Sequence, residues 1–529
     1  MRARKRRGDK PFAVMTPDLA TARDLVEVDA PAARLLTGPR RPIVLMPRRD
    51  GAPVTEAVAP RNPDLGILLA YTPLHTLLFG LPGDEPSPTA LVMTSGNLAG
   101  EPICFTDTAA LERLSHLSDG WLMHDREILV PCDDSVMRIV SLGDGCRDAV
   151  EVPIRRSRGY APLPVALPVP APPSLAVGAD LKNTLAVADG RYAWLSQHIG
   201  DMDDLATLSA FDSAQRHLSE LTSVAPEVVI ADAHPQYRST EWARRNAAGR
   251  PVRTVQHHHA HIAAVMAEHG LDGSTQVLGF AFDGTGYGPD GAVWGGEILL
   301  ANYKGAQRLA HLKYVPLAGG DVSVLRPYRM ALAHLRSAGI AWDPALPPVS
   351  ACPRAEREAL AGQLETGLGC APTSSMGRLF DAVSSLAGVR HVVAYEAQAA
   401  IELEGLSRGV DCGTATYAFA VDGSDTTAVI DPAPVLHAVV DDLLAGVPAP
   451  VIGARFHRAV ADLVVHLACA HADSSRPVAL SGGVFQNALL LEMTLDGLHD
   501  RGIDALTHRT VPPNDGGIAL GQLMVGNAS

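Results

Sequence analysis

Residues 277–288 read Val-Leu-Gly-Phe-Ala-Phe-Asp-Gly-Thr-Gly-Tyr-Gly, an apolar run that ends in a carboxylate and a glycine-rich turn. The apolar part, residues 277–282, predicts a short buried strand. Asp283 follows that strand directly, and the neighbouring glycines let the backbone approach a ligand closely. A carboxylate in this position can turn into a cleft and bind a metal ion.

Four histidines occupy the stretch His257-His258-His259-Ala260-His261, a short way before that strand. On a helix, His257 and His261 lie one turn apart and project from the same face. This spacing suits two imidazoles that bind one divalent metal. A histidine-rich tract can also be a solvated segment or a cloning tag, although the internal position before the apolar residues 262–266 argues against a tag. Spacing alone leaves the metal site and the solvated tract open.

Glycine and aspartate turns follow other predicted strands in the same part of the chain. They lie at residues 178–182, 481–487 and 512–517. Glycines let the backbone approach a phosphate or a ribose, and a following helix N-terminus favours an anion. Such turns, when several converge, are typical of actin-like ATPase folds, which hold a nucleotide between two lobes. Asp515 is a candidate fourth metal ligand, and an Asp is equally suited to cap the helix that follows.

The clearest boundary is the proline-rich segment 162–173, Pro-Leu-Pro-Val-Ala-Leu-Pro-Val-Pro-Ala-Pro-Pro. Such a run favours polyproline II and predicts a semi-rigid linker. It separates a domain at residues 1–161 from a domain at residues 174–529. In the first of these, apolar β-rich runs alternate with helical segments, which predicts a mixed α/β or α+β domain.

The composition is that of a large globular protein. The chain has 529 residues, 47% of them hydrophobic and 19% charged, which allows several packed domains. The net charge of -14 argues against a nucleic-acid partner, although residues 1–10 are basic. The most apolar long stretch, residues 65–81, contains Pro73 and His75 and falls short of a membrane span. Seven cysteines without a C-x-x-C pair fit a reducing compartment and predict a cytoplasmic protein.

Three polar segments of the first domain have the chemistry of phosphate ligands. Residues 5–11 read Lys-Arg-Arg-Gly-Asp-Lys-Pro, and residues 94–97 read Thr-Ser-Gly-Asn after a predicted strand. Residues 153–159, Pro-Ile-Arg-Arg-Ser-Arg-Gly, add guanidinium groups suited to phosphate. By composition alone, each segment is also typical of a surface loop.

Taken together, these segments resemble the HypF family of carbamoyltransferases, which act in [NiFe]-hydrogenase maturation. Residues 1–161 resemble its YrdC-like domain and residues 174–529 its TsaD-like domain, in the family's order. The resemblance implies an α/β and α+β protein, in which a YrdC-like domain precedes a two-lobed actin-like ATPase domain. The motifs that carry it are Lys5-x-Arg7 with Lys10-Pro11, Thr94-Ser-Gly-Asn97, Asp133-Asp-Ser135, Ile154-Arg-Arg-Ser-Arg-Gly159, Gly178-Ala-Asp-Leu-Lys-Asn183, Gln256-His-His-His-Ala-His261, Phe282-Asp-Gly-Thr-Gly-Tyr-Gly288, Ser375-Met-Gly-Arg-Leu-Phe-Asp381, Leu480-Ser-Gly-Gly-Val-Phe-Gln-Asn487 and Pro513-Asn-Asp-Gly-Gly517.

The resemblance implies two reactions. In the YrdC-like domain, carbamate and ATP, accompanied by Mg²⁺, form carbamoyl-adenylate and pyrophosphate. In the TsaD-like domain, the carbamoyl group passes to the C-terminal cysteine of a HypE-type acceptor protein. One metal ion, zinc or iron, would be bound by the residues implied in catalysis, which are His257, His261, Asp283 and Asp515. The residues implied in binding substrates and nucleotides are Lys5, Arg7, Lys10, Ser95, Asn97, Ser135, Arg155, Arg156, Arg158, Lys182, Gly377, Asp381, Gly482, Gly483 and Asn487.

The sequence departs from the family at its front. HypF proteins begin with an acylphosphatase-like domain and two C-x-x-C zinc fingers, and a glycine-rich segment precedes their Lys-x-Arg motif. None of these is present in this sequence. We therefore expect a YrdC-like domain that is incomplete at its N-terminus, and no breakdown of carbamoyl phosphate by this chain alone.

Two other functions are compatible with the sequence. A threonylcarbamoyl-transfer enzyme of tRNA modification shares both kinds of domain, but there they are separate chains. The triple histidine is also more typical of HypF, and the scarcity of basic residues argues against tRNA. The non-enzymatic alternative is an inactive, truncated scaffold that only binds a partner.

Overall fold

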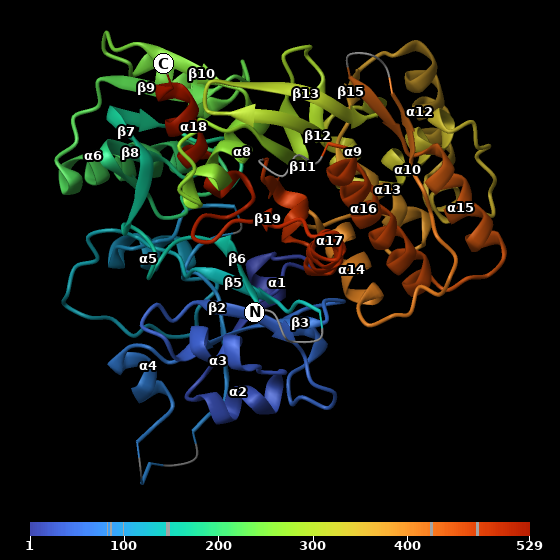
Figure 1. Ribbon diagram of the computed structural model, residues 1–529. Coiled ribbons are helices and arrows are strands. Elements are labelled where there is room, and N and C mark those ends of the chain that lie inside the picture. The colour runs from blue at the N-terminus through green and yellow to red at the C-terminus, as the bar shows by residue number, and fades with distance from the viewer. Residues whose placement is uncertain are drawn as a thin grey trace.

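The computed structural model describes residues 1–81, 83–84, 87–98, 100–143, 149–423, 427–471 and 476–528. Within these residues, the strands form three sheets of six, four and nine strands. Figure 1 shows a smaller N-terminal domain, in blue, below a larger domain with two lobes. The predicted order, a mixed α/β domain followed by a two-lobed domain, is confirmed.

The first domain is a six-stranded sheet with helices on its outer face. Its elements are α1 (Arg2–Lys5), β1 (Ala13–Thr16), α2 (Leu19–Leu25), α3 (Ala30–Thr37), β2 (Ile43–Pro47), η1 (Glu56–Val58), β3 (Asp64–Leu69), α4 (Pro73–Leu78), β4 (Leu91–Met93), α5 (Asp107–Leu114), β5 (Val136–Val140) and β6 (Val150–Arg155). The strand order is β4-β1-β3-β2-β5-β6. Val14, Val44 and Ile67 of the sheet form a buried core with Leu36 of α3. The α2 and α3 helices therefore cover the face that points away from the second domain (Figure 1).

The first lobe of the second domain is a four-stranded sheet between two layers of helices. Its elements are β7 (Pro164–Ala176), β8 (Ala186–Leu195), α6 (Leu205–Thr222), β9 (Val228–Asp232), α7 (Arg238–Arg245), β10 (Val252–Val255), α8 (His257–Glu268) and α18 (Ile518–Asn527). Successive strand residues point to opposite faces of a sheet. Leu175 therefore packs in the core that includes Phe211 of α6, while Ala176 packs in the core that includes Ile262 of α8.

The second lobe is a nine-stranded sheet with helices packed around it. Its elements are β11 (Val277–Tyr287), β12 (Val293–Asn302), β13 (Gly305–Leu312), β14 (Val315–Ala318), α9 (Asp321–Leu325), α10 (Pro327–Ser337), α11 (Pro347–Ala351), α12 (Arg354–Thr366), β15 (Cys370–Thr373), α13 (Met376–Leu386), α14 (Gln398–Ser407), β16 (Ala420–Asp422), β17 (Ala428–Asp431), α15 (Ala433–Leu444), α16 (Ala449–Ala470), β18 (Val478–Ser481), η2 (Gly483–Gln486), α17 (Ala488–His499), β19 (Ala505–Leu506) and η3 (Asp515–Gly517). The β11 and β18 strands run in parallel, with Ala281 opposite Ser481. This pairing stops at Ala281, so Asp283 lies beside the turn that follows β18. The strand β11 continues to Tyr287 with a register shift between Phe282 and Gly286, so Asp283 lies within a strand and not, as the sequence predicted, after it.

The proline-rich segment is a strand, and the prediction of a linker at residues 162–173 is wrong. Most of this segment lies in β7, which pairs antiparallel with β8 and, only from Ser174 onward, in parallel with β9. The prolines lie where β7 has one open edge, and register shifts interrupt the pairing at Ala171. Proline cannot donate to a neighbouring strand, so it is tolerated on such an edge. Pairing with β8, which no local pattern reveals, outweighs the preference for polyproline II.

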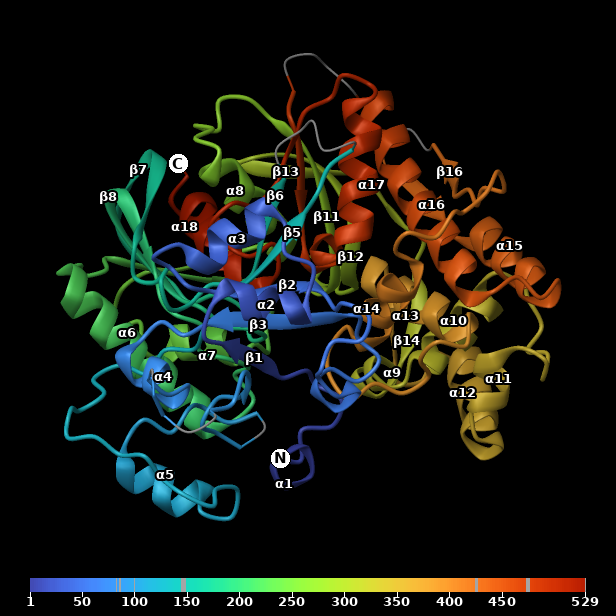
Figure 2. The same ribbon diagram turned by 90° about the horizontal axis from the view of Figure 1, so that it is seen from below.

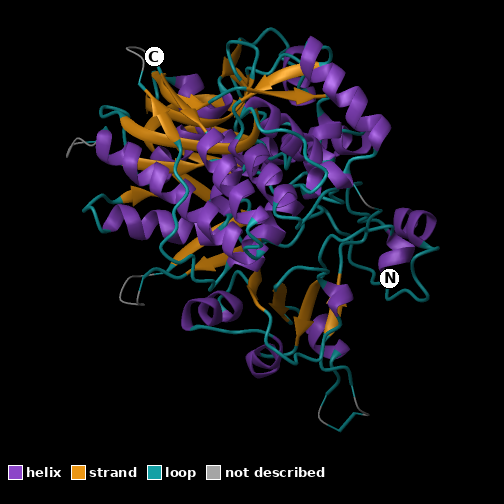
Figure 3. Ribbon diagram, turned by 90° about the vertical axis from the view of Figure 1, so that its right-hand side faces the viewer, coloured by secondary structure: helices purple, strands orange, loops and turns teal. Residues whose placement is uncertain are grey.

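The first domain docks against the helical side of the second lobe. Figure 2, seen from below, shows β3 lying beside α14, and Figure 3 shows the first-domain sheet as a layer of its own. The contact between Asp64 at the start of β3 and Arg408 at the end of α14 supports this arrangement. No helix in the part of the chain that the structure describes is long and apolar enough to cross a membrane.

Candidate functional site

The two outer histidines of the tract lie in the first turns of α8, which is buried along its length. Gln256 caps this helix by accepting a hydrogen bond from the backbone N–H of His259. The neighbouring α18 packs so closely that a Cβ on Gly521 would lie 1.7 Å from the Ala260 carbonyl oxygen. The histidines are buried, so the solvated-tract interpretation is wrong. Their position on a fixed helix directs both outer rings toward Asp283 of β11.

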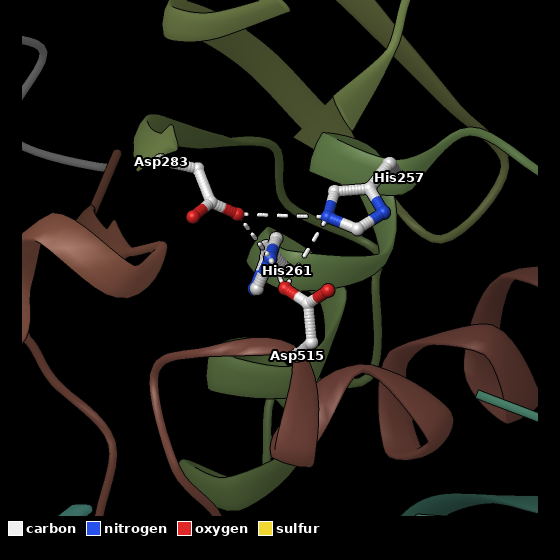
Figure 4. A group of neighbouring side chains, drawn as sticks. All are labelled: His257, His261, Asp283 and Asp515. Carbon is white, nitrogen blue, oxygen red and sulfur yellow. Dashed lines mark hydrogen bonds and ion pairs between the residues drawn. The ribbon is translucent and has the colours of Figure 1, made fainter. Parts of the chain in front are cut away.

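The four predicted metal ligands converge at one buried point (Figure 4). Each of His257, His261, Asp283 and Asp515 offers one ligand atom, and these atoms lie within 4.8 Å of one another. The Oδ2 atom of Asp283 lies 3.1 Å from His261 Nε2 and 3.5 Å from His257 Nε2. The Oδ1 atom of Asp515 lies 3.6 Å from His257 Nε2, a buried nitrogen that has no hydrogen-bond partner. Two imidazoles and two carboxylates around an unpartnered nitrogen fit zinc or iron.

Hydrogen bonds behind the histidines orient both rings. The His257 Nδ1 atom lies 2.8 Å from Asp232 Oδ2, and both side chains are fully buried. Behind His261, the Ser481 hydroxyl lies 3.4 Å from Nδ1 and 2.8 Å from His508 Nε2. Metal-binding histidines commonly use their second nitrogen in this way. These contacts leave the Nε2 atoms of both rings facing the carboxylates.

The electrostatics of the cluster favour a bound cation. Burial alone would lower the pKa of His257, but the Asp515 and Asp232 carboxylates raise it well above its usual value. Burial alone would raise the pKa of Asp283, but hydrogen bonds from His257 and His261 hold it well below its usual value. Protons on the rings thus balance the carboxylates. A divalent metal would displace these protons and take over the same role.

One cavity of about 1560 Å³ adjoins this cluster and reaches into the first domain. Asp283 and Asp515 line it from the second domain, and Lys5 and Arg7 line it from the first. The predicted substrate and nucleotide residues along its wall are Lys5, Arg7, Lys10, Ser95, Asn97, Arg155, Arg156, Lys182, Gly377, Asp381, Gly483 and Asn487. The structure therefore brings two distant sets of predicted residues into one space.

At the first-domain end, Lys5 is held by the turn that follows β4. Its ammonium group donates to Thr94 Oγ1 at 2.7 Å, to the Ser95 carbonyl at 2.6 Å and to Asn97 Oδ1 at 3.1 Å. Burial, together with the charge of Arg7, lowers the pKa of Lys5 to about 8. The basic segment and the 94–97 turn, which were predicted separately as phosphate ligands, are therefore in direct contact. An anion at this end of the cavity would relieve the repulsion between the cations.

The arginine segment after β6 is used largely for structure. Arg155 lies 3.1 Å from Asp133 at the cavity wall. Arg156 is buried and donates to three backbone carbonyls, among them that of Leu195 in β8. Arg158 pairs with Asp134 at 2.8 Å. Arg156 therefore joins the first domain to the second, while Arg155 and Arg158 pair within the first domain.

Three predicted substrate residues do not line the cavity. Ser135 donates from its hydroxyl to the Arg158 carbonyl and accepts from the Ser157 backbone N–H. Arg158 binds Asp134 and two carbonyls of the first domain. Gly482 has a φ of +95°, and a Cβ there would lie 2.2 Å from the Phe282 carbonyl oxygen. For these positions the prediction is corrected, because backbone groups from distant segments occupy their polar atoms or their space.

The other predicted nucleotide residues of the second domain surround the cluster. A Cβ on Gly377 would lie 2.9 Å from Gly284 Cα, so α13 begins directly against β11 next to Asp283. Asp381 lies 3.0 Å from Arg378 Nη2, and burial raises the pKa of Asp381 to about 6. Asn487 caps α17 by accepting from a backbone N–H. These contacts fix the cavity wall beside the cluster.

Sequence reasoning missed several residues that support the site. Asp232 is the last residue of the strand β9 and follows an apolar run, as Asp283 does, so the same pattern could have indicated it. His508 and its buried partner Glu268, 2.8 Å apart, carry no such signal because they are remote in sequence. Lys182 was predicted, but its partner Glu396 was not.

Models of protein families match nearly the whole chain. Residues 1–147 match the Sua5/YciO/YrdC model, described as telomere recombination. Residues 170–268 match the HypF Kae1-like domain, and residues 279–522 match the second subdomain of the carbamoyltransferase Kae1-like domain. The fold and the site therefore define a protein in which a YrdC-type domain is joined to a Kae1-like domain.

Individual relatives narrow this class. Carbamoyltransferase HypF2 of Cupriavidus necator is 41% identical over 572 residues, which cover 99% of this chain and 68% of the relative. HypF of Rhodobacter capsulatus is 40% identical, over 100% of this chain and 68% of its own. The crystal structure of full-length HypF in the phosphate- and nucleotide-bound form has a TM-score of 0.91 and 39% identity, and the match covers 99% of this chain and 80% of that one. The chain belongs to the HypF family of carbamoyltransferases and is an enzyme of that kind.

Proposed function

We propose that this chain forms carbamoyl-adenylate in its first domain and transfers the carbamoyl group in its second. The acceptor is the C-terminal cysteine of a HypE-type protein in the cytoplasm, in the maturation of [NiFe]-hydrogenases. The observation that carries the proposal is that Lys5 and Arg7 at one end, and Asp283 and Asp515 at the other, line the same cavity. An intermediate formed at one end can reach the other inside the protein.

In the first step, a carbamate oxygen attacks the α-phosphorus of ATP. A carbamoyl–phosphate bond forms, the bond to the β-phosphate breaks, and pyrophosphate leaves with its negative charge. Lys5, Arg7 and Lys10 supply positive charge where that negative charge gathers, which is the arrangement that lowers such barriers. Mg²⁺ would accompany the phosphates of ATP, as in other sites of this kind.

In the second step, the acceptor thiolate attacks the carbamoyl carbon. A carbon–sulfur bond forms, the bond between that carbon and the phosphate oxygen breaks, and AMP leaves. Because a thiolate is already a good nucleophile near neutral pH, the chain need not supply one. A zinc or iron ion held by His257, His261, Asp283 and Asp515 would neutralise charge on the AMP phosphate.

The residues of the chain position the reacting groups for this step. The backbone N–H groups of Gly284 and Gly483 donate to Asp283 Oδ1 at 2.7 and 3.3 Å, which holds that carboxylate with its Oδ2 atom toward the histidines. Gly377 lets α13 approach β11 next to the same carboxylate. A nucleotide in the cavity would therefore meet a preformed wall rather than a loop that must fold around it.

The test supplies carbamate directly. The purified chain, ATP, Mg²⁺ and ammonium carbamate are incubated with a HypE-type acceptor, and mass spectrometry follows the addition of one carbamoyl group to its C-terminal cysteine. We expect transfer by the wild type and none by Asp283→Asn, because an amide is a poorer metal ligand of nearly the same shape. Asp290→Asn is the matched control, since Asp290 lies outside the cavity wall and binds Trp294 and Tyr314.

The other outcomes distinguish the alternatives. Binding of the acceptor without any transfer by the wild type would favour the scaffold. Threonylcarbamoylation of tRNA in place of the acceptor would favour the tRNA-modifying enzyme. Transfer that Asp283→Asn leaves intact would remove the four-ligand cluster from the mechanism.

A further inference from the structure

Two arginines and two carboxylates form a cluster where the domains meet. Asp64 and Arg138 belong to β3 and β5 of the first domain, while Glu404 and Arg408 belong to α14 and its C-terminal cap. The Arg138 Nη2 atom lies 2.7 Å from Asp64 Oδ2 and 2.8 Å from Glu404 Oε1. The Arg408 guanidinium lies 2.6 Å from Asp64 Oδ1 and 2.9 Å from Glu404 Oε1. Each carboxylate therefore contacts both arginines, and the four charges balance.

The cluster is largely buried where the domains meet, and Asp64, Arg138 and Glu404 also line the cavity. The side chain of Glu404 is 2% exposed and that of Arg138 is 10% exposed. Beside it, the first domain approaches α14 so closely that a Cβ on Gly405 would lie 2.6 Å from Pro63 Cδ. Buried ion pairs seldom add net stability over apolar groups, and their best-attested use is to specify one arrangement. Two ion pairs of the cluster, Arg138–Glu404 and Arg408–Asp64, cross between the first domain and α14.

Two contacts extend this cluster to the backbone of the second domain. The Arg138 Nη1 atom donates to the Gln486 carbonyl oxygen at 3.2 Å. The Glu404 Oε1 atom accepts from the Ala488 backbone N–H at 3.2 Å. Gln486 ends the short helix η2, and Ala488 begins α17. The cluster thus holds the polypeptide on both sides of Asn487.

The same stretch of backbone reaches the metal cluster at its other end. In the 482–487 turn, the Gly483 backbone N–H donates to Asp283 Oδ1 at 3.3 Å. Gly483 and Asn487 both line the cavity. The turn is therefore held at one end by a metal-ligand candidate and at the other by Arg138, a side chain of the first domain.

We propose that Arg138 is a positioning residue for the 482–487 turn of the second domain. By holding the Gln486 carbonyl, it keeps the turn in the shape that accepts the nucleotide, so the transfer site is complete only while the first domain is docked. The role in nucleotide binding rests on the proposed function, whereas the ordering of the turn does not.

Hydrogen exchange tests the ordering of the turn without any ligand. We expect Arg138→Met to speed amide exchange in residues 482–490, while exchange in α8 and β11 stays as in the wild type. The matched control is Arg408→Met, which removes the same charge from the same cluster but makes no contact with the turn. Wild-type exchange in Arg138→Met would overturn the proposal, and so would equal acceleration by Arg408→Met.

Titration with AMP tests the consequence for binding. The full-length chain carries Lys5→Ala and Arg7→Ala throughout, so that the first-domain end of the cavity binds phosphate poorly. In that background we expect Arg138→Met to weaken AMP binding about tenfold, as the loss of a charged hydrogen bond would, and Arg138→Lys to recover part of it. Unchanged affinity in Arg138→Met would contradict the proposal. If the parent chain binds no AMP, the proposed function has failed, and hydrogen exchange still decides the role of Arg138.

A charge-balanced variant keeps the test decisive if Arg138→Met does not fold. Arg138→Met combined with Glu404→Gln leaves Asp64 and Arg408 as a neutral pair, so no uncompensated charge is buried. A Gln at position 404 can still accept from the Ala488 N–H. We expect this double variant to fold and to show the same faster exchange at residues 482–490. A folded double variant with a fully protected turn would overturn the proposal.

Discussion

The two ends of the cavity carry opposite excesses of charge. At the first-domain end, the pKa of Lys5 is lowered by burial and by Arg7, and that of Lys10 by burial and by Arg155. At the second-domain end, carboxylates raise the pKa of His257 well above its usual value despite its burial. The first end is therefore short of an anion and the second is short of a cation. The positive charge of the first-domain end therefore favours a phosphate ligand, and the negative charge of the second-domain end favours a metal ion.

The two ends also differ in how their side chains are supported. The ligands of the second end come from the helix α8, from the strand β11 and from the short helix η3, and contacts with Asp232 and Ser481 orient the two histidines. The cations of the first end come from the four-residue helix α1 and the loop after it. Sites on helices and strands are held more precisely than sites on loops, which here carry Arg7 and Lys10. We therefore expect the second end to be more sensitive to small changes.

The largest expected effect separates the two ends. His257→Ala with His261→Ala should reduce bound metal from about one ion per chain to near zero, because two of the four ligands are lost. Carbamoyl transfer should fall by more than about 100-fold, while carbamate-dependent ATP–pyrophosphate exchange at the first end continues. Elemental analysis and an exchange assay on the same preparation measure both. Unchanged metal content in the double variant would remove the metal site.

A smaller effect on metal binding is expected from Asp232, which contacts the ligand His257. Asp232→Ala should weaken metal affinity about 10- to 100-fold, because it leaves the His257 ring without its orienting hydrogen bond. Competition with a chelator measures the affinity, and circular dichroism checks that the fold is kept. If Asp232→Ala leaves metal affinity unchanged, the second-domain end of the cavity does not depend on the hydrogen bond that orients His257.

The first end should respond to pH through Lys5. Its pKa of about 8 lies below the usual value, so the ammonium group is charged below pH 8 and loses its proton above it. Affinity for ATP should therefore fall as pH rises through 8, by up to about tenfold per unit above that value. Lys5→Arg should bind ATP with little change over the same range, since a guanidinium stays protonated. If ATP affinity depends on pH equally in the wild type and in Lys5→Arg, a group other than Lys5 causes the dependence.

The features of the fold and of the site that the sequence predicts are those that depend only on residues close together in the chain. The one-turn spacing of His257 and His261, and the position of Asp283 after an apolar run, follow from helix and strand geometry alone. The full set of four, with Asp515, was implied by the family resemblance, and the structure places their ligand atoms within 4.8 Å of one another. The binding of a metal there stays a prediction.

The features that sequence reasoning missed depend on partners far along the chain. The proline-rich segment became a strand because β8 pairs with it. Ser135 and Arg158 bind one another's segments instead of the cavity. The contact between Arg138 and Gln486 joins two domains, and no sequence motif predicts it. A polar side chain that already forms hydrogen bonds with distant backbone groups stabilises the fold and is not free to bind a ligand.

The smallest expected effect concerns the ion pair between Lys182 and Glu396, which joins the two lobes near the cluster. Both side chains are partly exposed, 29% and 49%, and exposed pairs contribute at most about 1 kcal/mol. Glu396→Gln should therefore change the free energy of unfolding by less than about 1 kcal/mol, and a double-mutant cycle with Lys182→Met should give a coupling of the same size. Denaturant unfolding at low and high salt measures it, and high salt should weaken it further. A coupling above about 2 kcal/mol that resists salt would contradict this expectation. It would show that this pair holds the two lobes together as firmly as a buried contact does.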